Sequence, residues 1–248
     1  MQKGDSRLKA SWLIPPDILE LQPHQVDIWR IDLSHSIGSL EILKKTLSTD
    51  ESQRAARFHF REDKDRFVAA HGSLRDILSR YLYCEPKQLR FSTNAYGKPA
   101  LLDHELEFNL SHSGNFVLAA ITLERKVGID VEQIRPEISS QSIARHYFSP
   151  AEVAELFALS TEQWEIGFFG CWTRKEAYIK AQGLGLSLPL VSFDVSLNPG
   201  EPARLRATRP DPQEAERWTL ISLETDPQYA SAVAIEDQNV EFRFWDWN

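Results

Sequence analysis

Two acidic residues in the stretch GIDVE have the spacing of neighbours on one face of a β-strand. Asp130 and Glu132 alternate with isoleucine and valine, and side chains two residues apart on a strand point to the same side. Their carboxylates then lie within reach of one another, where like charges make each other harder to ionise. This arrangement indicates that a positively charged group lies between them.

A second pair of charged residues follows in the stretch CWTRKEAYIKAQG. Glu176 and Lys180 are four residues apart, so on a helix they share a face in the order that favours an ion pair. Taken alone, this spacing predicts only a surface salt bridge worth a few tenths of a kcal/mol, about 0.3–0.5. The same stretch also contains Trp172 and Lys175 and lies downstream of an intact G-I-D-x-E, so the pair does not stand alone.

Together these residues resemble the signature of the Sfp-type 4′-phosphopantetheinyl transferases. That signature is a G-[IV]-D-x-E strand followed by W-x-x-K-E-[AS]-x-x-K on a helix. The stretches FSTNAYGKPAL, FNLSHSG, FHFREDKDR and GLGLSLPLVSF also resemble that family, so the similarity extends over most of the chain. The resemblance implies that the 4′-phosphopantetheine arm of coenzyme A is transferred to a serine of an apo acyl or peptidyl carrier protein, with release of adenosine 3′,5′-bisphosphate.

The resemblance also implies a metal site and two catalytic residues. Its metal ligands would be Asp130, Glu132 and Glu176, and three carboxylates suit a hard octahedral cation such as Mg²⁺. Glu176 would accept the serine proton, directly or through a metal-bound water. Lys180 would hold the transferring or departing phosphate as a point charge. The choice between Mg²⁺ and Mn²⁺ is left open.

Coenzyme A needs further partners for its 3′-phosphate and its adenine, and the family motifs supply candidates. A protonated imidazole can donate from both nitrogens, and a glycine lets the backbone come close to a phosphate. The candidate contacts are Arg54, Arg66, Gly97, Lys98, Pro99, Ser111, His112, Lys175 and Lys180.

The chain departs from the family in two places. Glu51 and Ser52 stand where relatives often carry lysine, which weakens the basic contribution to coenzyme A binding there. His146 stands where relatives commonly carry arginine before two aromatic residues, a change that bears on carrier docking. Carrier proteins are typically acidic, as is this chain, so we expect docking to rest on a local apolar groove with basic rims. Its predicted walls are residues 143–169 and the GLSLPL loop.

The elements that must position these residues can be read from the pattern. Residues 26–33 and 127–131 are strand-like, residues 40–47 and most of 48–83 are helical, and LEFNLSHSGNFVLAAITL contains two short strands around a turn. The helix that carries Glu176 ends at Gly183, a C′ glycine. Because FVLAAI and YASAVAI echo each other, we expect an α+β fold of two similar α/β halves related by pseudo-two-fold symmetry, with the active site at their interface.

The expected division lies at LERK, between residues 1–125, which would contact coenzyme A, and residues 126–248, which would carry the metal and catalytic residues. Small carrier-protein synthases build this interface between subunits. Two halves in one chain supply it internally, so we expect a monomer.

The composition limits the class of protein and the cellular compartment that the sequence is compatible with. A chain of 248 residues with 42% hydrophobic and 26% charged residues is typical of a globular protein. A net charge of −8 argues against general binding to nucleic acid or anionic membranes. No secretory leader and no run of about 20 apolar residues is evident. Cys84 and Cys171 form no C-x-x-C arrangement, which argues against a zinc site or a disulfide framework. These features predict a cytoplasmic protein.

Two other functions would use some of the same residues. A non-catalytic module that binds coenzyme A or a carrier would not need a third metal ligand and Lys180. A metal-dependent phosphohydrolase usually has additional His or Asp ligands for a second metal, and the sequence contains no such set. The class of carrier, whether for fatty acids, polyketides or nonribosomal peptides, is left open, as is the use of acylated coenzyme A.

Overall fold

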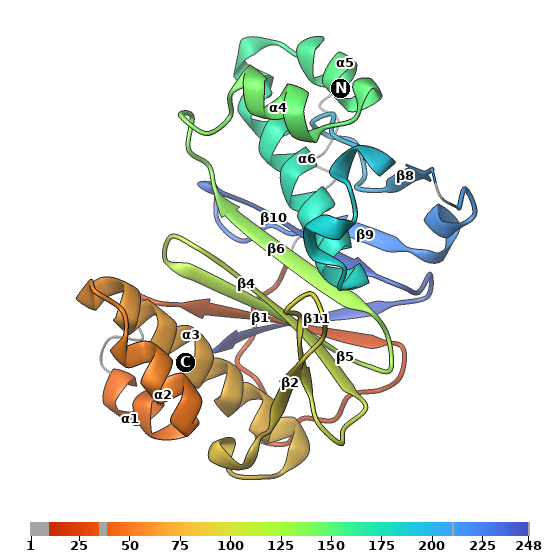
Figure 1. Ribbon diagram of the computed structural model, residues 1–248. Coiled ribbons are helices and arrows are strands. Elements are labelled where there is room, and N and C mark those ends of the chain that lie inside the picture. The colour runs from red at the N-terminus through yellow and green to blue at the C-terminus, as the bar shows by residue number, and fades with distance from the viewer. Residues whose placement is uncertain (1–9, 35–38, 210, 248) are drawn as a thin grey trace.

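Two β-sheets, each covered by one long helix, form the body of the protein (Figure 1). The computed structural model describes residues 10–34, 39–209 and 211–247. One sheet has the strand order β11-β1-β5-β4, and the other has the order β6-β10-β9. The strands of these sheets are β1 (Gln25–Asp32), β4 (Leu106–Ser113), β5 (Phe116–Leu123), β6 (Val127–Gln133), β9 (Thr219–Ser222), β10 (Tyr229–Ile235) and β11 (Glu241–Trp247).

The first half runs from β1 to β5, and its described residues form three helices before a small hairpin. In chain order its other elements are α1 (Leu40–Thr46), α2 (Thr49–Ala56), α3 (Arg61–Leu82), the 3-10 turn η2 (Pro86–Gln88), β2 (Phe91–Thr93) and β3 (Pro99–Leu101). β5 pairs antiparallel with both β1 and β4.

The second half repeats this order from β6 to β10. Its other elements are α4 (Gln141–Tyr147), α5 (Pro150–Phe157), α6 (Thr161–Gln182), the 3-10 turns η3 (Gly185–Ser187), η4 (Leu190–Ser192) and η5 (Glu214–Arg217), and the hairpin strands β7 (Phe193–Val195) and β8 (Leu205–Thr208). β10 pairs antiparallel with both β6 and β9. The predicted mixed fold of two similar halves is therefore confirmed, and the two echoing stretches are the equivalent strands β5 and β10.

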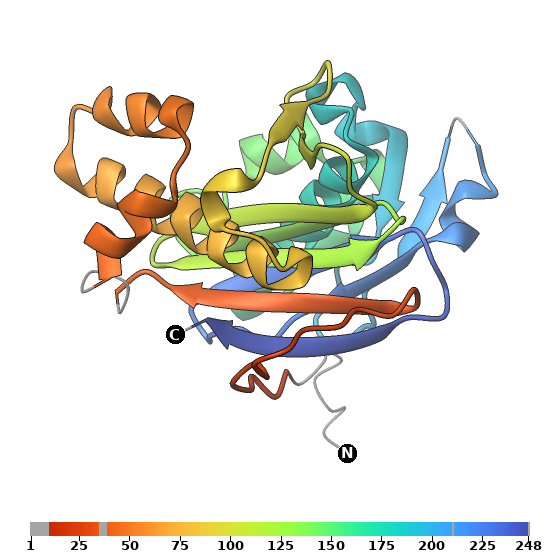
Figure 2. The same cartoon turned by 90° about the horizontal axis from the view of Figure 1, so that it is seen from below.

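The last strand crosses back to the first half. β11 pairs with β1 in parallel and closes one edge of that sheet, as seen from below in Figure 2. Arg243 of β11 donates to the buried Asp27 of β1 at 2.6 and 2.8 Å, and the Tyr81 hydroxyl donates to the same carboxylate at 2.5 Å. The division at residues 125/126 stays a prediction, because this strand belongs to one half in sequence and to the other in space.

The two sheets face each other across an apolar layer. Val127, Ile129 and Val131 of β6 are fully buried there together with Val26 and Ile28 of β1. Because alternate residues of a strand point to opposite sides, this burial turns Asp130 and Glu132 toward α6.

The end of α6 agrees with the sequence expectation. Gly183 ends α6 with φ of 68°, a left-handed conformation that glycine adopts without strain. Cys84 and Cys171 are both free thiols. No helix within the described residues has the length and apolar character needed to cross a bilayer.

Candidate active site

The two halves meet where β4 lies beside β6 (Figure 1). They are joined there by side chains of β4 that accept hydrogen bonds from the β6 backbone. The N–H groups of Ile129, Val131 and Gln133 donate, in that order, to the side chains of Asn109 (2.9 Å), Ser111 (3.3 Å) and Ser113 (3.0 Å). These three acceptors occupy alternate positions of β4 and therefore point to one side of the strand. That side of β4 binds the backbone of β6, the strand of the second half that carries Asp130 and Glu132.

The positive group beside the acidic strand is Lys180. Its ammonium lies 2.6 Å from Asp130 Oδ1 and 2.8 Å from Ser111 Oγ. Ser111 Oγ also donates to Asp130 Oδ1 at 2.9 Å, and Ser113 Oγ donates to Glu132 Oε2 at 2.9 Å. Side chains from β4, β6 and α6 therefore meet at one point between the halves, which brings together Ser111, Asp130 and Lys180 from distant parts of the sequence.

The pKa values of three carboxylates around this point are raised by burial and, for two of them, by neighbouring carboxylates. Burial raises the pKa of Asp130, although Lys180 opposes the shift. Burial and then the charge of Asp130 raise the pKa of Glu132. For Glu176, burial and the charges of Asp130 and Glu132 raise the pKa to about 6. The repulsion expected from the sequence is thus present, and an additional cation at this point would relieve it.

The donor set fits a hard cation in its chemistry. Asp130 Oδ2 is buried and has no hydrogen-bond partner among the described residues, and an oxygen in that position is available to coordinate a cation. Within the described ranges, however, no three His, Cys, Asp or Glu side chains are arranged as a ready metal cluster. Lys180 supplies the cation next to Asp130 in this structure.

A cavity of about 270 Å³ opens at the end of α6, and we call it the glycine-turn pocket. It contains the predicted Gly97, Lys98 and Pro99 together with Glu176 and Lys180. Tyr96, with 53% of its surface exposed, stands at its rim.

A second cavity of about 300 Å³, the basic pocket, lies in the first half. The predicted Arg54, Arg66 and His112 line it, and His71 joins them. Burial and then the positive charges of Lys180, His71 and Arg66 lower the pKa of His112. Although Asp63 also lines the cavity, 3.8 Å from Arg66, the basic side chains outnumber it and suit the cavity to an anion.

His71 is a site residue that the sequence analysis missed. Its ring stacks on Phe67 at 4.0 Å, and its Nδ1 lies 3.5 Å from Glu51 Oε1. The sequence contains a signal for this residue. Phe67 and His71 are four residues apart on the helix that also carries Arg66, so the ring of His71 lies on the same face of the helix as Phe67.

Lys98 lies at the predicted place, but its ammonium faces the protein. Nζ donates to the backbone oxygens of Val127 (3.1 Å) and Ala181 (3.2 Å), and burial lowers its pKa. Lys98 thereby ties the β2–β3 hairpin to the second half, while Gly97 and Pro99 offer their backbone to the pocket.

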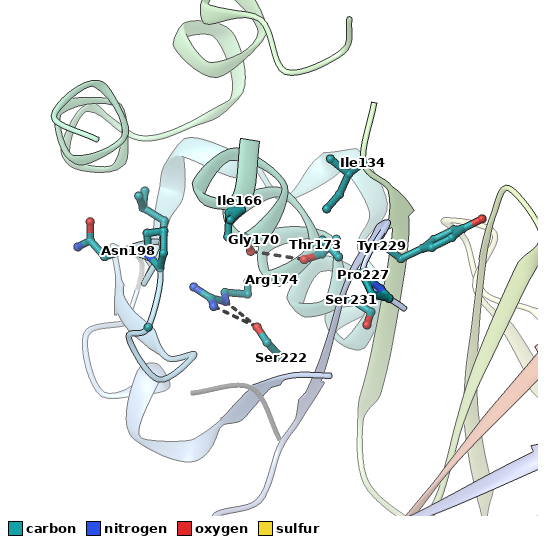
Figure 3. Close-up of a pocket in the computed structure, with 14 residues that line it drawn as sticks. Ile134, Ile166, Gly170, Thr173, Arg174, Asn198, Ser222, Pro227, Tyr229 and Ser231 are labelled. Atoms are coloured by element: carbon teal, nitrogen blue, oxygen red, sulfur yellow. Dashed lines mark hydrogen bonds between the residues drawn. The ribbon is translucent and has the colours of Figure 1, made fainter. Parts of the chain in front are cut away.

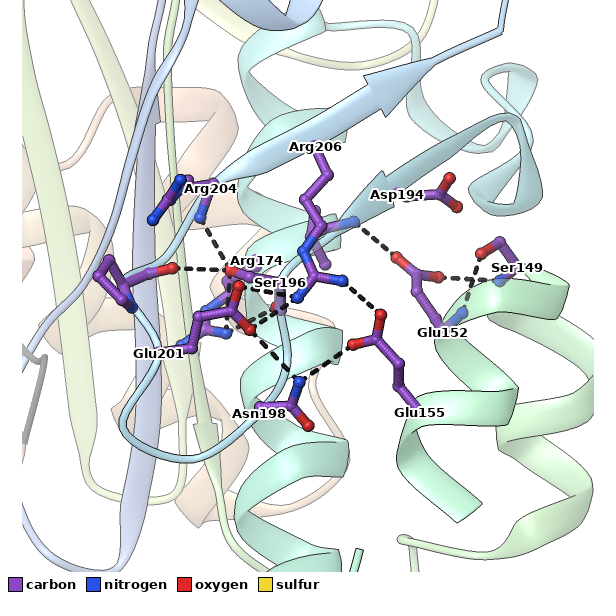
Figure 4. A network of polar contacts seen from close by, with 12 residues as sticks. Ser149, Glu152, Glu155, Arg174, Asp194, Ser196, Asn198, Glu201, Arg204 and Arg206 are labelled. Atoms are coloured by element: carbon purple, nitrogen blue, oxygen red, sulfur yellow. Dashed lines mark hydrogen bonds and ion pairs between the residues drawn. The ribbon is translucent and has the colours of Figure 1, made fainter. Parts of the chain in front are cut away.

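The prediction that Lys175 contacts coenzyme A is wrong. Its side chain has 0% exposure, and Nζ donates to Glu152 Oε1 (2.7 Å) and to the oxygen of Phe193 (2.8 Å). Glu152 also accepts from the backbone of Ser149 and Val195, as part of the polar network in Figure 4. A helix of this kind turns neighbouring residues in different directions, so Glu176 reaches the site and Lys175 reaches the core.

The acidic residue in the place of a family lysine has a structural function. Glu51 forms a capping box with Ser48 at the start of α2 and pairs with Arg75 Nε at 2.6 Å. It therefore fixes α2 against α3, and its other carboxylate oxygen lies 3.5 Å from His71 of the basic pocket.

Comparison with known proteins gives matches along most of the chain. A family model described as the 4′-phosphopantetheinyl transferase superfamily matches residues 126–234, and one described as 4′-phosphopantetheinyl transferase, N-terminal, matches residues 34–124. The chain is 41% identical over 242 residues to 4′-phosphopantetheinyl transferase HetI of Nostoc sp. (strain PCC 7120), covering 96% of this chain and 99% of that protein. It is 34% identical over 188 residues to 4′-phosphopantetheinyl transferase Sfp of Bacillus subtilis (strain 168), covering 75% and 81%.

Among solved structures, holo-[acyl-carrier-protein] synthase of Thermotoga maritima is a distant likeness. It has 20% identity and a TM-score of 0.36, and the match covers 46% of this chain and 63% of that one.

Proposed function

Because the chain belongs to the 4′-phosphopantetheinyl transferase superfamily, of the Sfp type, and is an enzyme with that activity, we propose the following reaction. Coenzyme A donates its phosphopantetheine arm to a serine of an apo acyl or peptidyl carrier protein, and adenosine 3′,5′-bisphosphate is released. The observation that carries this proposal is the contact of Lys180 with Asp130 and Ser111 between the two halves. Lys180 lines the glycine-turn pocket together with Glu176, and His112, the neighbour of Ser111 on β4, lines the basic pocket.

In the proposed reaction the serine oxygen attacks the β-phosphorus, and Glu176 accepts the hydroxyl proton. With its pKa raised to about 6, Glu176 is ionised near neutral pH and still basic enough to take a proton. The bond from the β-phosphorus to the bridging oxygen breaks as the new bond forms. Lys180 stabilises the negative charge on the phosphate that leaves.

We assign the metal site to Asp130, Glu132 and Glu176. The unsatisfied Asp130 Oδ2 and the raised pKa values of all three carboxylates support this assignment. A bound Mg²⁺ would neutralise pyrophosphate charge in this position. The same assignment requires Lys180 to move from Asp130 toward the phosphate, a short displacement for a flexible side chain.

We assign the two ends of the nucleotide to the two pockets. Arg54, Arg66 and His112, joined by His71, are suited to the 3′-phosphate because they place cations and imidazole donors around one cavity. The glycine-turn pocket is suited to adenine, since an aromatic rim and an open backbone offer stacking and hydrogen bonds to a flat base. Ser111, which contacts Lys180 and Asp130, would lie beside the pyrophosphate.

The proposal extends to the setting of the enzyme. The interface that carries the site lies within one chain, so we propose a cytoplasmic monomer, with residues 1–125 binding mainly coenzyme A and residues 126–248 supplying metal ligands and catalysis. The carrier would dock on residues 143–169 and the loop of residues 185–190.

Incubation with Mg²⁺, coenzyme A and a panel of apo carriers tests the proposed function. Transfer increases the carrier's mass by one phosphopantetheine and releases adenosine 3′,5′-bisphosphate in equal amount. Release of the nucleotide without a heavier carrier would instead show a phosphohydrolase. Absence of both products with every carrier, while coenzyme A still binds, would show a binding module.

A further inference from the structure

Tyr229, at the start of β10, reaches from the second half into the first. Its side chain is buried in the apolar layer between the two sheets, where its ring meets that of Phe116 of β5 edge-on, with centroids 4.9 Å apart. Tyr229 lines a cavity of about 390 Å³ together with Thr173 and Arg174, but its hydroxyl points away from both, toward the first half (Figure 3). This hydroxyl accepts a hydrogen bond from the backbone N–H of Asn115 at 3.2 Å. Tyr229 therefore contacts the first half with its ring and with its hydroxyl.

The group that the Tyr229 hydroxyl holds is the tight turn of residues 114–115 between β4 and β5. Gly114 has a φ of 55°, a left-handed conformation that glycine adopts without strain. A Cβ on Gly114 would overlap the Tyr229 hydroxyl oxygen, so the turn lies directly against the tyrosine. The turn is also held by the first half, because the oxygen of Asn115 accepts from the N–H of Leu33 at 2.8 Å. The turn is therefore fixed between Tyr229 and the residue that follows β1.

The same turn forms part of the wall of the basic pocket. Gly114 and Leu33 line that pocket together with the basic side chains, among them His112. His112 precedes Gly114 by two residues at the end of β4, so the position of the turn determines where the imidazole lies. Tyr229 therefore fixes one wall of a pocket to which it contributes no atom of its own within the described lining.

The end of β4 that carries this turn also contacts the acidic strand. Ser113, between His112 and the turn, donates to Glu132 Oε2 at 2.9 Å and accepts from the N–H of Gln133 at 3.0 Å. Gln133 is in turn the residue of β6 that pairs with Tyr229 of β10. Tyr229 therefore lies where the wall of the basic pocket meets the strand with the carboxylates.

We propose that Tyr229 is a positioning residue for the transfer, because its hydroxyl holds the basic pocket at a fixed place relative to the acidic strand. The inference rests on the proposed function, which assigns the 3′-phosphate of coenzyme A to the basic pocket and its pyrophosphate to the metal site. One ligand binds best at two points when their separation is fixed beforehand, because no free energy is then lost in ordering the two halves. Tyr229 acts through the turn and through His112, and it contacts neither the donor nor the carrier.

Removing the hydroxyl tests this inference. Tyr229→Phe keeps the ring against Phe116 and leaves the N–H of Asn115 without its partner. The matched control is Tyr178→Phe, because Tyr178 of α6 is also buried and its hydroxyl accepts from Gln182 of the same helix at 2.9 Å. Steady-state kinetics with coenzyme A and with 3′-dephospho-coenzyme A gives KM and kcat for each donor. Calorimetry without a carrier gives the affinity for each.

We expect Tyr229→Phe to raise KM for coenzyme A about three- to tenfold, the typical contribution of one neutral hydrogen bond. KM for 3′-dephospho-coenzyme A and kcat with either donor should change less than about twofold, because the metal site and Glu176 are untouched. Tyr178→Phe should behave as the wild type with both donors. Equal effects of Tyr229→Phe on the two donors would overturn the inference, as would a fall in kcat alone or no effect at all.

A double variant shows whether Tyr229 acts through the basic pocket. In the background of His112→Ala, Tyr229→Phe should raise KM for coenzyme A by less than about twofold, because the imidazole that the turn positions is absent. The full three- to tenfold effect in that background would overturn the inference. A general loss of stability would instead lower the melting temperature and leave the two substitutions additive.

Two further measurements separate this inference from the proposed function. If the wild type transferred the arm to no carrier, the proposed function would be refuted, and the calorimetric affinities of the two donors would still decide the inference. If Tyr229→Phe unfolds, Gly114→Ala disturbs the same contact from the turn, since its Cβ would overlap the Tyr229 hydroxyl. Gly114→Ala should weaken coenzyme A binding more than 3′-dephospho-coenzyme A binding, and equal weakening would count against the role of Tyr229.

Discussion

The two halves use one framework for different purposes. α3 and α6 both have 22 residues, and each carries a buried cation that pairs with the capping-box glutamate of the preceding helix. Arg75 pairs with Glu51 at 2.6 Å in the first half, and Lys175 pairs with Glu152 at 2.7 Å in the second. The two cations stand at the same distance from the first residue of their helices. A common ion pair therefore fixes both long helices.

The halves differ at the positions beside this pair. Asp76 and Arg80 of α3 form an i, i+4 salt bridge at 3.0 Å, with 32% and 34% of their side chains exposed. The equivalent positions of α6 hold Glu176 and Lys180, and there Lys180 contacts Asp130 instead.

The strand under each helix explains this difference. Trp29 pairs with Ala119 in the first half as Asp130 pairs with Ala232 in the second. Trp29 and its neighbour on the same face, Ile31, are fully buried under α3. Where the first half completes a core with apolar side chains, the second half has two carboxylates. The acidic residues of the second half therefore stand at positions where the first half has apolar packing.

The largest expected effect separates charge from packing at these equivalent positions. Asp130→Asn should abolish transfer, because it removes the charge on which Lys180 and the proposed metal depend, while its amide oxygen keeps the hydrogen bonds from Lys180 and Ser111. Trp29→Ala should lower the free energy of unfolding by about 3–5 kcal/mol and leave turnover per folded molecule intact. Transfer assays and urea unfolding measure both. Near-normal turnover of Asp130→Asn would contradict the assignment of the metal site to Asp130.

The second largest effect is expected at Glu176 of α6, compared with the equivalent Asp76 of α3. Glu176→Gln should lower kcat by about 10² to 10⁴, the usual worth of a general base, with little change in coenzyme A affinity. Asp76→Asn, the equivalent change in α3, should cost under about 1 kcal/mol of stability and leave kcat alone. If both variants behave alike in steady-state kinetics, Glu176 has no role as a base.

Breaking the common ion pair should affect stability and not the site. Lys175→Met leaves Glu152 buried without its partner, which should cost about 3–5 kcal/mol of unfolding free energy. Arg75→Met should cost a similar amount in the first half. Chemical denaturation measures the loss, and coenzyme A binding to the folded fraction should be unchanged. A raised Michaelis constant for coenzyme A with wild-type stability would restore Lys175 as a ligand.

A substitution in the basic pocket tests whether the first half binds the 3′-phosphate of coenzyme A. His112→Ala should raise the Michaelis constant for coenzyme A by about 10- to 100-fold, the worth of one hydrogen bond to a charged group. The rise should be much smaller with 3′-dephospho-coenzyme A, because the partner group is absent from that donor. Equal effects on both donors would move His112 away from the 3′-phosphate.

The smallest effect concerns pH. Although burial opposes the shift, hydrogen bonds from His71, Ser48 and Arg75 lower the pKa of Glu51 to about 2, from 4.5. A lowered folded-state pKa contributes stability above pH 4.5 that is lost as the pH falls toward 2. Glu51→Gln should therefore be less stable than the wild type at neutral pH, and the difference should shrink between pH 4.5 and 2. Thermal melting across that range measures it, and a constant difference would contradict the shift.

The sequence by itself determined the family, the mixed fold of two halves and most of the residues that meet at the site. Strand and helix periodicity were sufficient to place Asp130 and Glu132 on one face and Glu176 with Lys180 on another. Local spacing determines which residues share a face, because backbone geometry repeats every two or 3.6 residues. The C′ role of Gly183 followed for the same reason, since it depends only on backbone conformation.

Only the tertiary structure decided which partner each side chain takes. Lys180 and Glu176 satisfy the local rule for an ion pair, yet Lys180 contacts Asp130 because β6 brings a buried carboxylate next to it. Lys175 belongs to the same motif and turns into the core, where Glu152 from another helix neutralises it. His71 joins the basic pocket, and β11 joins the sheet of the other half. These outcomes depend on contacts between segments far apart in the chain, and long-range packing leaves no periodic signal in the sequence.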